Sequence, residues 1–95
     1  MTKHFNQLTE AEQERLVILI EECAEVGQAG CKILRHGYES CNPHDPTRET
    51  NRDALYRELQ DLMYSILCME DAGDIKEVEV SCDDINAKAP YIHHQ

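Results

Sequence analysis

Two short acidic motifs constrain this chain most, because each lies inside one of its two most apolar segments. The first motif is Glu21-Glu22-x-x-Glu25 and the second is Glu58-x-x-Asp61. Acids three positions apart share one face of an α-helix. Two carboxylates about 4 Å apart repel each other by about 4 kcal/mol at an effective dielectric constant of about 20. The motifs therefore predict helices that carry costly negative charge beside apolar side chains.

The first apolar segment predicts a long helix over about residues 10–36. Thr9 and Glu12 have the spacing of a capping box ahead of the apolar run. Gly37 is a suitable stop. Apolar side chains recur at helical spacing in a stripe so wide that burial on more than one side is expected. The stripe consists of Leu16, Val17, Leu19, Ile20, Cys23, Val26, Gly27, Ile33 and Leu34.

The second apolar segment predicts a helix over about residues 51–72. Thr50 and Asp53 predict its N-terminal cap, and Gly73 its end. Its core stripe consists of Leu55, Leu59, Leu62, Ile66 and Met69. A loop with Pro43 and Pro46, over residues 37–47, connects the two helices. Connections of this length within a small domain are often functional.

The last part of the chain predicts little regular structure. Residues 75–80 alternate apolar and charged side chains as a strand does, but no second strand is available, so we expect a short helix or turn. Ser81 and Asp84 predict the cap of a brief helix over residues 81–88, which Pro90 ends.

These elements predict an all-α fold in a single domain spanning residues 1–95, with a core over about residues 8–91. It has two long antiparallel helices plus one or two short ones. Two helices cannot bury the apolar surface described above. We therefore expect a homo-oligomer, a tetramer or a dimer, in which pairs of chains form a four-helix bundle.

Composition narrows the classes of partner. The net charge of −10 argues against nucleic acid polymers and anionic membrane surfaces as partners. An anionic small substrate is still allowed if metal ions lie between it and the protein. The longest apolar run is too short to span a membrane, and no signal peptide is recognisable. The five cysteines, an odd number without Cys-x-x-Cys spacing, predict reduced thiols and a cytoplasmic location.

The acids themselves leave two interpretations open. In one they form a solvated helix face, partly neutralised by Arg52 and Arg57. In the other they hold a hard divalent cation. No basic residue lies four positions from Glu22 or four after Glu25, so intrahelical ion pairs do not explain these two acids. Magnesium accepts oxygen ligands and keeps other positions for water and substrate phosphates.

Together, the two motifs resemble the signature of the MazG-like all-alpha nucleoside triphosphate pyrophosphohydrolase superfamily. That superfamily includes the dCTP pyrophosphatases, the dimeric dUTPases and the phosphoribosyl-ATP pyrophosphatases. Residues 84–90, Asp-Ile-Asn-Ala-Lys-Ala-Pro, are similar to the Asn-x-Lys/Arg-x-x-Pro type segment that follows the acidic helices in these enzymes. The position of Pro90 departs from that pattern by one residue. The resemblance covers about residues 8–91.

The resemblance implies a nucleoside triphosphate pyrophosphatase, which cleaves between the α and β phosphates to give a nucleoside monophosphate and pyrophosphate. It implies Mg²⁺, with Mn²⁺ as a substitute, held by Glu22, Glu25, Glu58 and Asp61. Glu21 would be an extra ligand or would orient the attacking water. Glu21 and Glu22 are thus the candidate catalytic residues.

Three residues are candidates for binding the substrate. By helical angle, Lys32 lies on the side of Glu25 and would hold a phosphate. Its alternative is a solvated lysine that pairs with Glu25 or Gln28. The resemblance implies that Asn86 and Lys88 close over the substrate, and their alternative is a cap-and-turn sequence.

Two other functions fit the same helices. One is a non-catalytic acidic helical module for dimerisation or interaction with a basic partner. The other is a nucleotide sensor that binds without turnover. Cys41 and His44 are spaced like half of a zinc site, but no second pair completes it. Tyr38 and Tyr91 are candidates for stacking on a base.

Overall fold

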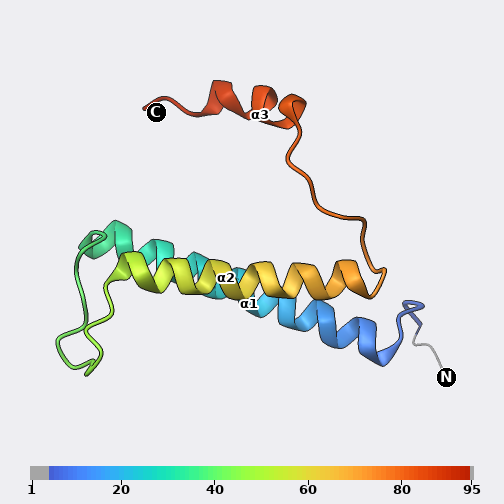
Figure 1. Ribbon diagram of the computed structural model, residues 1–95, viewed down its shortest axis with the longest axis horizontal. Coiled ribbons are helices and arrows are strands. Elements are labelled where there is room, and N and C mark those ends of the chain that lie inside the picture. Colours follow the sequence, from blue (N-terminus) through green and yellow to red (C-terminus); the bar gives the residue numbers. More distant parts are fainter. Residues whose placement is uncertain (1–4, 95) are drawn as a thin grey trace.

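The computed structural model describes residues 5–94, and in this range the chain is helical and contains no β-strand. The elements are α1 (Glu10–His36), α2 (Asn51–Asp71), α3 (Cys82–Lys88) and the 3₁₀ helix η1 (Ala89–Tyr91). The two long helices lie side by side and run antiparallel (Figure 1). The predicted all-α class and the long helix pair are therefore confirmed. No helix in the described range is long and apolar enough to cross a membrane.

Helix α1 begins and ends where the local sequence predicts. The Thr9 hydroxyl accepts a hydrogen bond from the Glu12 N–H at 3.1 Å, and the Glu12 carboxylate accepts one from the Thr9 N–H at 2.8 Å. This reciprocal pair confirms the capping box. At the other end Gly37 has φ of 87°, and its N–H donates to the Ile33 carbonyl at 2.7 Å. A positive φ is readily adopted only by glycine, so Gly37 ends the helix.

Helix α2 is also bounded by its own sequence. The Thr50 hydroxyl accepts from the Asp53 N–H at 3.2 Å, which is the predicted cap. The helix ends at Asp71, one residue before the predicted end, and Gly73 follows with φ of 82°. Both long helices thus have ends that short-range signals fix.

The loop between the helices is hydrogen-bonded back onto the start of α2. The Asn51 N–H donates to the Ser40 carbonyl and the Arg52 N–H to the Tyr38 carbonyl, each at 2.9 Å. The Asn51 side-chain amide donates to the Gly37 carbonyl at 3.0 Å. These bonds satisfy N–H groups that the first turn of a helix leaves free, and they hold the loop in place.

An ion pair joins the start of α1 to the turn that follows α2. The Arg15 guanidinium on α1 donates to both carboxylate oxygens of Asp74, in the turn after α2, with one of the two distances at 2.9 Å. A bidentate pair of this kind is directional, since both N–H groups must align with both oxygens. It sets how the start of α1 lies against the end of α2.

The core between the helices is small. Ala29 and Met69 are the buried apolar residues of the described chain, and Ser65 is the buried polar one. Many large apolar side chains remain exposed on both long helices: Val17, Ile18, Ile20, Leu34, Tyr56, Leu59, Met63, Tyr64 and Leu67. This agrees with the expectation that two helices cannot bury the apolar surface. The four-helix bundle stays a prediction.

The segment after α2 differs in part from the prediction. A turn and bend occupy residues 72–75, and residues 76–81 are neither helix, turn nor strand. The expected short helix or turn over 75–80 is therefore wrong, whereas the strand that we did not expect there is absent. Val78 and Val80 are exposed, so burial of apolar side chains does not favour a helix here. The predicted cap of α3 is present, because the Ser81 hydroxyl accepts from the Asp84 N–H at 3.0 Å. α3 ends before Pro90, which lies in η1.

Candidate metal centre

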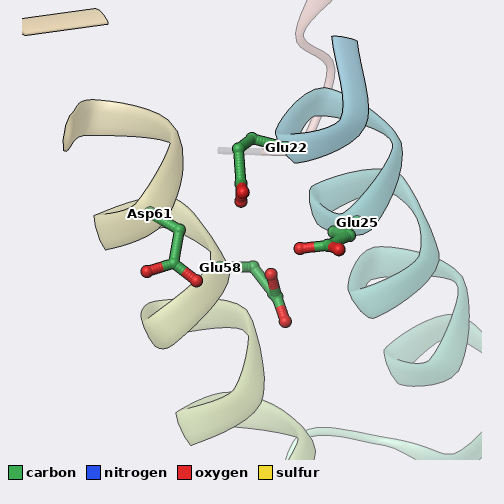
Figure 2. Close-up of side chains that lie close together, drawn as sticks. All are labelled: Glu22, Glu25, Glu58 and Asp61. Carbon is green, nitrogen blue, oxygen red and sulfur yellow. The ribbon is translucent and has the colours of Figure 1, made fainter. Parts of the chain in front are cut away.

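Four carboxylates from the two motifs meet between the long helices. Glu22 and Glu25 lie one turn apart on α1, and Glu58 and Asp61 lie one turn apart on α2 (Figure 2). One carboxylate oxygen from each residue lies within 4.8 Å of the other three. We call these four residues the acidic cluster. The antiparallel pairing of α1 and α2 therefore brings together motifs that are far apart in the sequence.

Two oxygens of the acidic cluster are buried without a hydrogen-bond donor. Glu22 and Glu58 are half-buried, whereas Glu25 and Asp61 are exposed. The Oε2 atoms of Glu22 and Glu58 find no partner among residues 5–94. A buried carboxylate oxygen without a partner loses its hydration and gains nothing in return. One such atom on each helix fits a cation that bridges the two helices.

Electrostatics within the acidic cluster raise the pKa of Glu25. The main cause is a side-chain hydrogen bond with Glu58, followed by repulsion from the negative charges of Glu22 and Glu58. A divalent cation between the helices would offset this repulsion, because metal ligands bind in the deprotonated form.

Arg57 reaches the acidic cluster through one oxygen of Glu58. Its Nη1 donates to Glu58 Oε1 at 2.9 Å, while Nε and Nη2 donate to Glu49 at 3.1 and 3.2 Å. Arg52 pairs instead with Glu39, at 2.8 Å, and lies 4.4 Å from the centre of the Tyr38 ring. The interpretation of the acids as a solvated, partly neutralised helix face therefore leaves the buried oxygen of Glu58 unexplained.

Lys32 lies beside the acidic cluster. It lines a cavity of about 230 Å³ together with Glu25, Arg57 and Glu58. It makes no ion pair with any described residue, so the alternative in which it pairs with Glu25 is not what the structure has. Glu21 is exposed and does not belong to the four-acid group.

Asn86 and Lys88 lie on α3, away from the acidic cluster. α3 contacts η1, but within the described chain neither of them packs on α1 or α2 (Figure 1). A single chain thus assembles the four predicted metal ligands and Lys32, but not the two predicted substrate-binding residues of the C-terminal segment.

The donor set suits a hard cation. All four groups are carboxylates, and the cluster includes no histidine or cysteine, which zinc sites usually contain. Cys41 and His44 gain no third ligand in the described part of the chain. The residues present therefore fit Mg²⁺ or Mn²⁺ better than Zn²⁺.

A second cavity, of about 370 Å³, was not anticipated from the sequence. It lies at the C-terminal end of α1 and is lined by Lys32, Arg35 and His36 together with residues of the following loop. The available signal was three basic residues within the last five positions of a helix in an acidic chain. That signal has an ordinary explanation, because basic side chains favour helix C-termini.

No protein-family model, curated protein or solved structure matches the chain. The resemblance to the MazG-like superfamily therefore depends on the motif residues alone. What the fold and site define is a class: an antiparallel helix pair with a carboxylate cluster suited to a hard divalent cation.

Proposed function

We propose that the protein is a magnesium-dependent nucleoside triphosphate pyrophosphohydrolase of the MazG-like type. It converts a (deoxy)nucleoside triphosphate into the monophosphate and pyrophosphate. The observation that carries the proposal is the acidic cluster, in which each helix contributes one buried carboxylate oxygen without a donor. The five cysteines are free thiols, which supports the proposed cytoplasmic location.

The carboxylates have separable tasks in this reaction. Glu22, Glu25, Glu58 and Asp61 would hold the cation. Bound Mg²⁺ would supply Lewis-acid polarisation of the phosphate oxygens. A water molecule attacks the α-phosphorus, the bond to the bridging oxygen breaks, and pyrophosphate leaves. A carboxylate of Glu21 or Glu22 orients the water and accepts its proton.

A second copy of the chain completes the proposed site. Asn86 and Lys88 make no contact with the long helices of their own chain. The apolar side chains on the long helices are left open in one chain. Both facts support assembly into a four-helix bundle, as a dimer or tetramer, in which the C-terminal segment of one copy reaches the acidic cluster of another.

Pyrophosphate release from a panel of common and modified nucleotides, with Mg²⁺ and with a chelator, tests the proposal. We expect release with Mg²⁺ only. Glu22→Gln and Glu58→Gln should each lower kcat/KM at least about 100-fold, since they remove a ligand that a bound cation needs. Glu14→Gln, an exposed acid of α1 outside the acidic cluster, is the matched control and should keep its activity.

Thermal unfolding separates this proposal from the non-catalytic alternatives. A ligand that binds only the folded state raises its stability. A nucleotide sensor would bind Mg²⁺ and nucleotide but release no pyrophosphate. An acidic interaction module would show neither a Mg²⁺-dependent rise of the melting temperature nor turnover. Either result, obtained across the whole nucleotide panel, would contradict the proposed hydrolysis and favour the corresponding alternative.

A further inference from the structure

The cavity at the end of α1 concentrates positive charge in an acidic protein. The chain has 19 acidic residues against nine lysines and arginines. Three basic side chains nevertheless line this cavity, and no carboxylate does. We call it the basic pocket and define it by Lys32, Arg35, His36, Ser40, Asn42 and Asn51. In a chain with a net charge of −10, a cavity lined by randomly placed residues would more often be acidic than basic.

The basic side chains of the basic pocket form no ion pair with any residue that the structure describes. Arg15, Arg52 and Arg57 each pair with a carboxylate. Arg35, His36 and Lys32 have no ion pair within residues 5–94. A set of cations around one cavity without carboxylate partners favours an anionic ligand.

The polar wall of the basic pocket is held by the fold. Asn51 donates through its backbone to Ser40 and through its side chain to Gly37. The Asn42 carboxamide oxygen accepts from the His44 N–H at 2.9 Å. A wall fixed by internal hydrogen bonds loses little entropy when a ligand binds, so it favours affinity.

Lys32 connects the basic pocket to the acidic cluster. It lines both the basic pocket and the cavity that Glu25 and Glu58 also line. It follows Glu25 by seven residues, which is two turns or about 10 Å along α1. Side chains on a helix lean toward its N-terminus, so Lys32 leans toward the acidic cluster. A ligand that extends from the acidic cluster along α1 therefore meets Lys32 first and then Arg35 and His36.

We propose that the basic pocket binds a phosphate or pyrophosphate group. In the reaction proposed above, on which this role rests, it holds the two terminal phosphates of the substrate while the α-phosphate lies at the acidic cluster. Arg35 and His36 then stabilise the negative charge that collects on pyrophosphate as the bond to the α-phosphate breaks. Neither residue belongs to the acidic motifs.

Calorimetric titration of inorganic pyrophosphate into the whole protein, in the presence of a chelator, tests the pocket without any turnover. We expect saturable binding, weakened at least about 10-fold in the double variant Arg35→Gln/His36→Gln, because two charge-assisted contacts are lost. Lys76→Gln removes the same kind of charge from an exposed position outside the pocket and should leave the affinity unchanged. The melting temperature of each variant checks its fold.

The proposed role of the basic pocket would be wrong if wild type and the double variant bound pyrophosphate with equal affinity. It would also be wrong if Lys76→Gln weakened binding as much as the double variant does. The nucleotide assay keeps the two proposals apart. Pyrophosphate binding that depends on Arg35 and His36, without any hydrolysis, supports the pocket and overturns the activity. Hydrolysis whose kcat/KM is the same in the double variant supports the activity and overturns the pocket.

Discussion

The unpaired oxygens of Glu22 and Glu58 carry the chemical argument at the level of single residues. Exposed acids such as Glu21 need no explanation, because water satisfies them. A buried oxygen without a donor does need one. Arg57 reaches only Oε1 of Glu58, so Oε2 stays without a donor. The case for a cation rests on these two atoms rather than on the number of acids in the chain.

Asp74 provides a pH-dependent prediction at the same scale. The hydrogen bond from Arg15 lowers the pKa of Asp74 below its ordinary value of 3.8. A depressed pKa in the folded state means that the carboxylate stabilises the fold above pH 3.8, and that this stability is lost as the pH falls through the folded pKa. Asp74→Asn should therefore lower the free energy of unfolding at pH 6, and by less at pH 3. Urea unfolding at both pH values measures this difference.

The matched control for Asp74→Asn is Asp71→Asn, an exposed acid near the same end of α2. It should change the stability little at either pH. If Asp74→Asn cost the same stability at pH 3 as at pH 6, the ion pair with Arg15 would not be the source of the effect.

At the scale of elements, the long helices were predictable because their signals are local. Thr9 with Glu12 and Thr50 with Asp53 fix the starts, and Gly37 and Gly73 follow the ends. That the two acidic motifs lie close together could be predicted once the two helices were expected to pack antiparallel. The segment 75–80 was not predictable, because its side chains are exposed and burial therefore favours no one local structure. The basic pocket was missed because the loop fold that walls it has no signal in the sequence.

Gly37 gives the prediction at this scale. Its φ of 87° and ψ of 166° lie in a region that glycine occupies almost exclusively. Gly37→Ala should therefore cost roughly 1–3 kcal/mol of unfolding free energy, although open space surrounds the added Cβ. Gly30→Ala, inside α1 and also in open space, should instead stabilise by about 0.5–1 kcal/mol. Denaturant unfolding compares the two. Equal effects would show that the backbone at Gly37 is not what ends α1.

For the whole molecule, the exposed side of α1 follows the spacing of a helix–helix seam. Six exposed positions are separated alternately by three and four residues: Val17, Ile20, Ala24, Gly27, Cys31 and Leu34. Ala29, which is buried, lies on the opposite side, toward α2. Small residues in the middle of such a seam permit close approach of another helix. The wide apolar stripe of α1 thus has one side covered by α2 and one side available to a second copy.

The last prediction places a charge in that seam. Ile20, 65% exposed in the single chain, would be buried between copies. If the chain were a monomer, Ile20→Lys would alter stability by only about 0.5 kcal/mol. In a bundle the lysine must lose its hydration, so the dimer or tetramer should dissociate, as sedimentation velocity would measure. Ala11→Lys adds the same charge on α1 outside the seam and should leave the assembly intact. Equal sedimentation of all three proteins as monomers would contradict the bundle and leave Asn86 and Lys88 without an acidic cluster to reach.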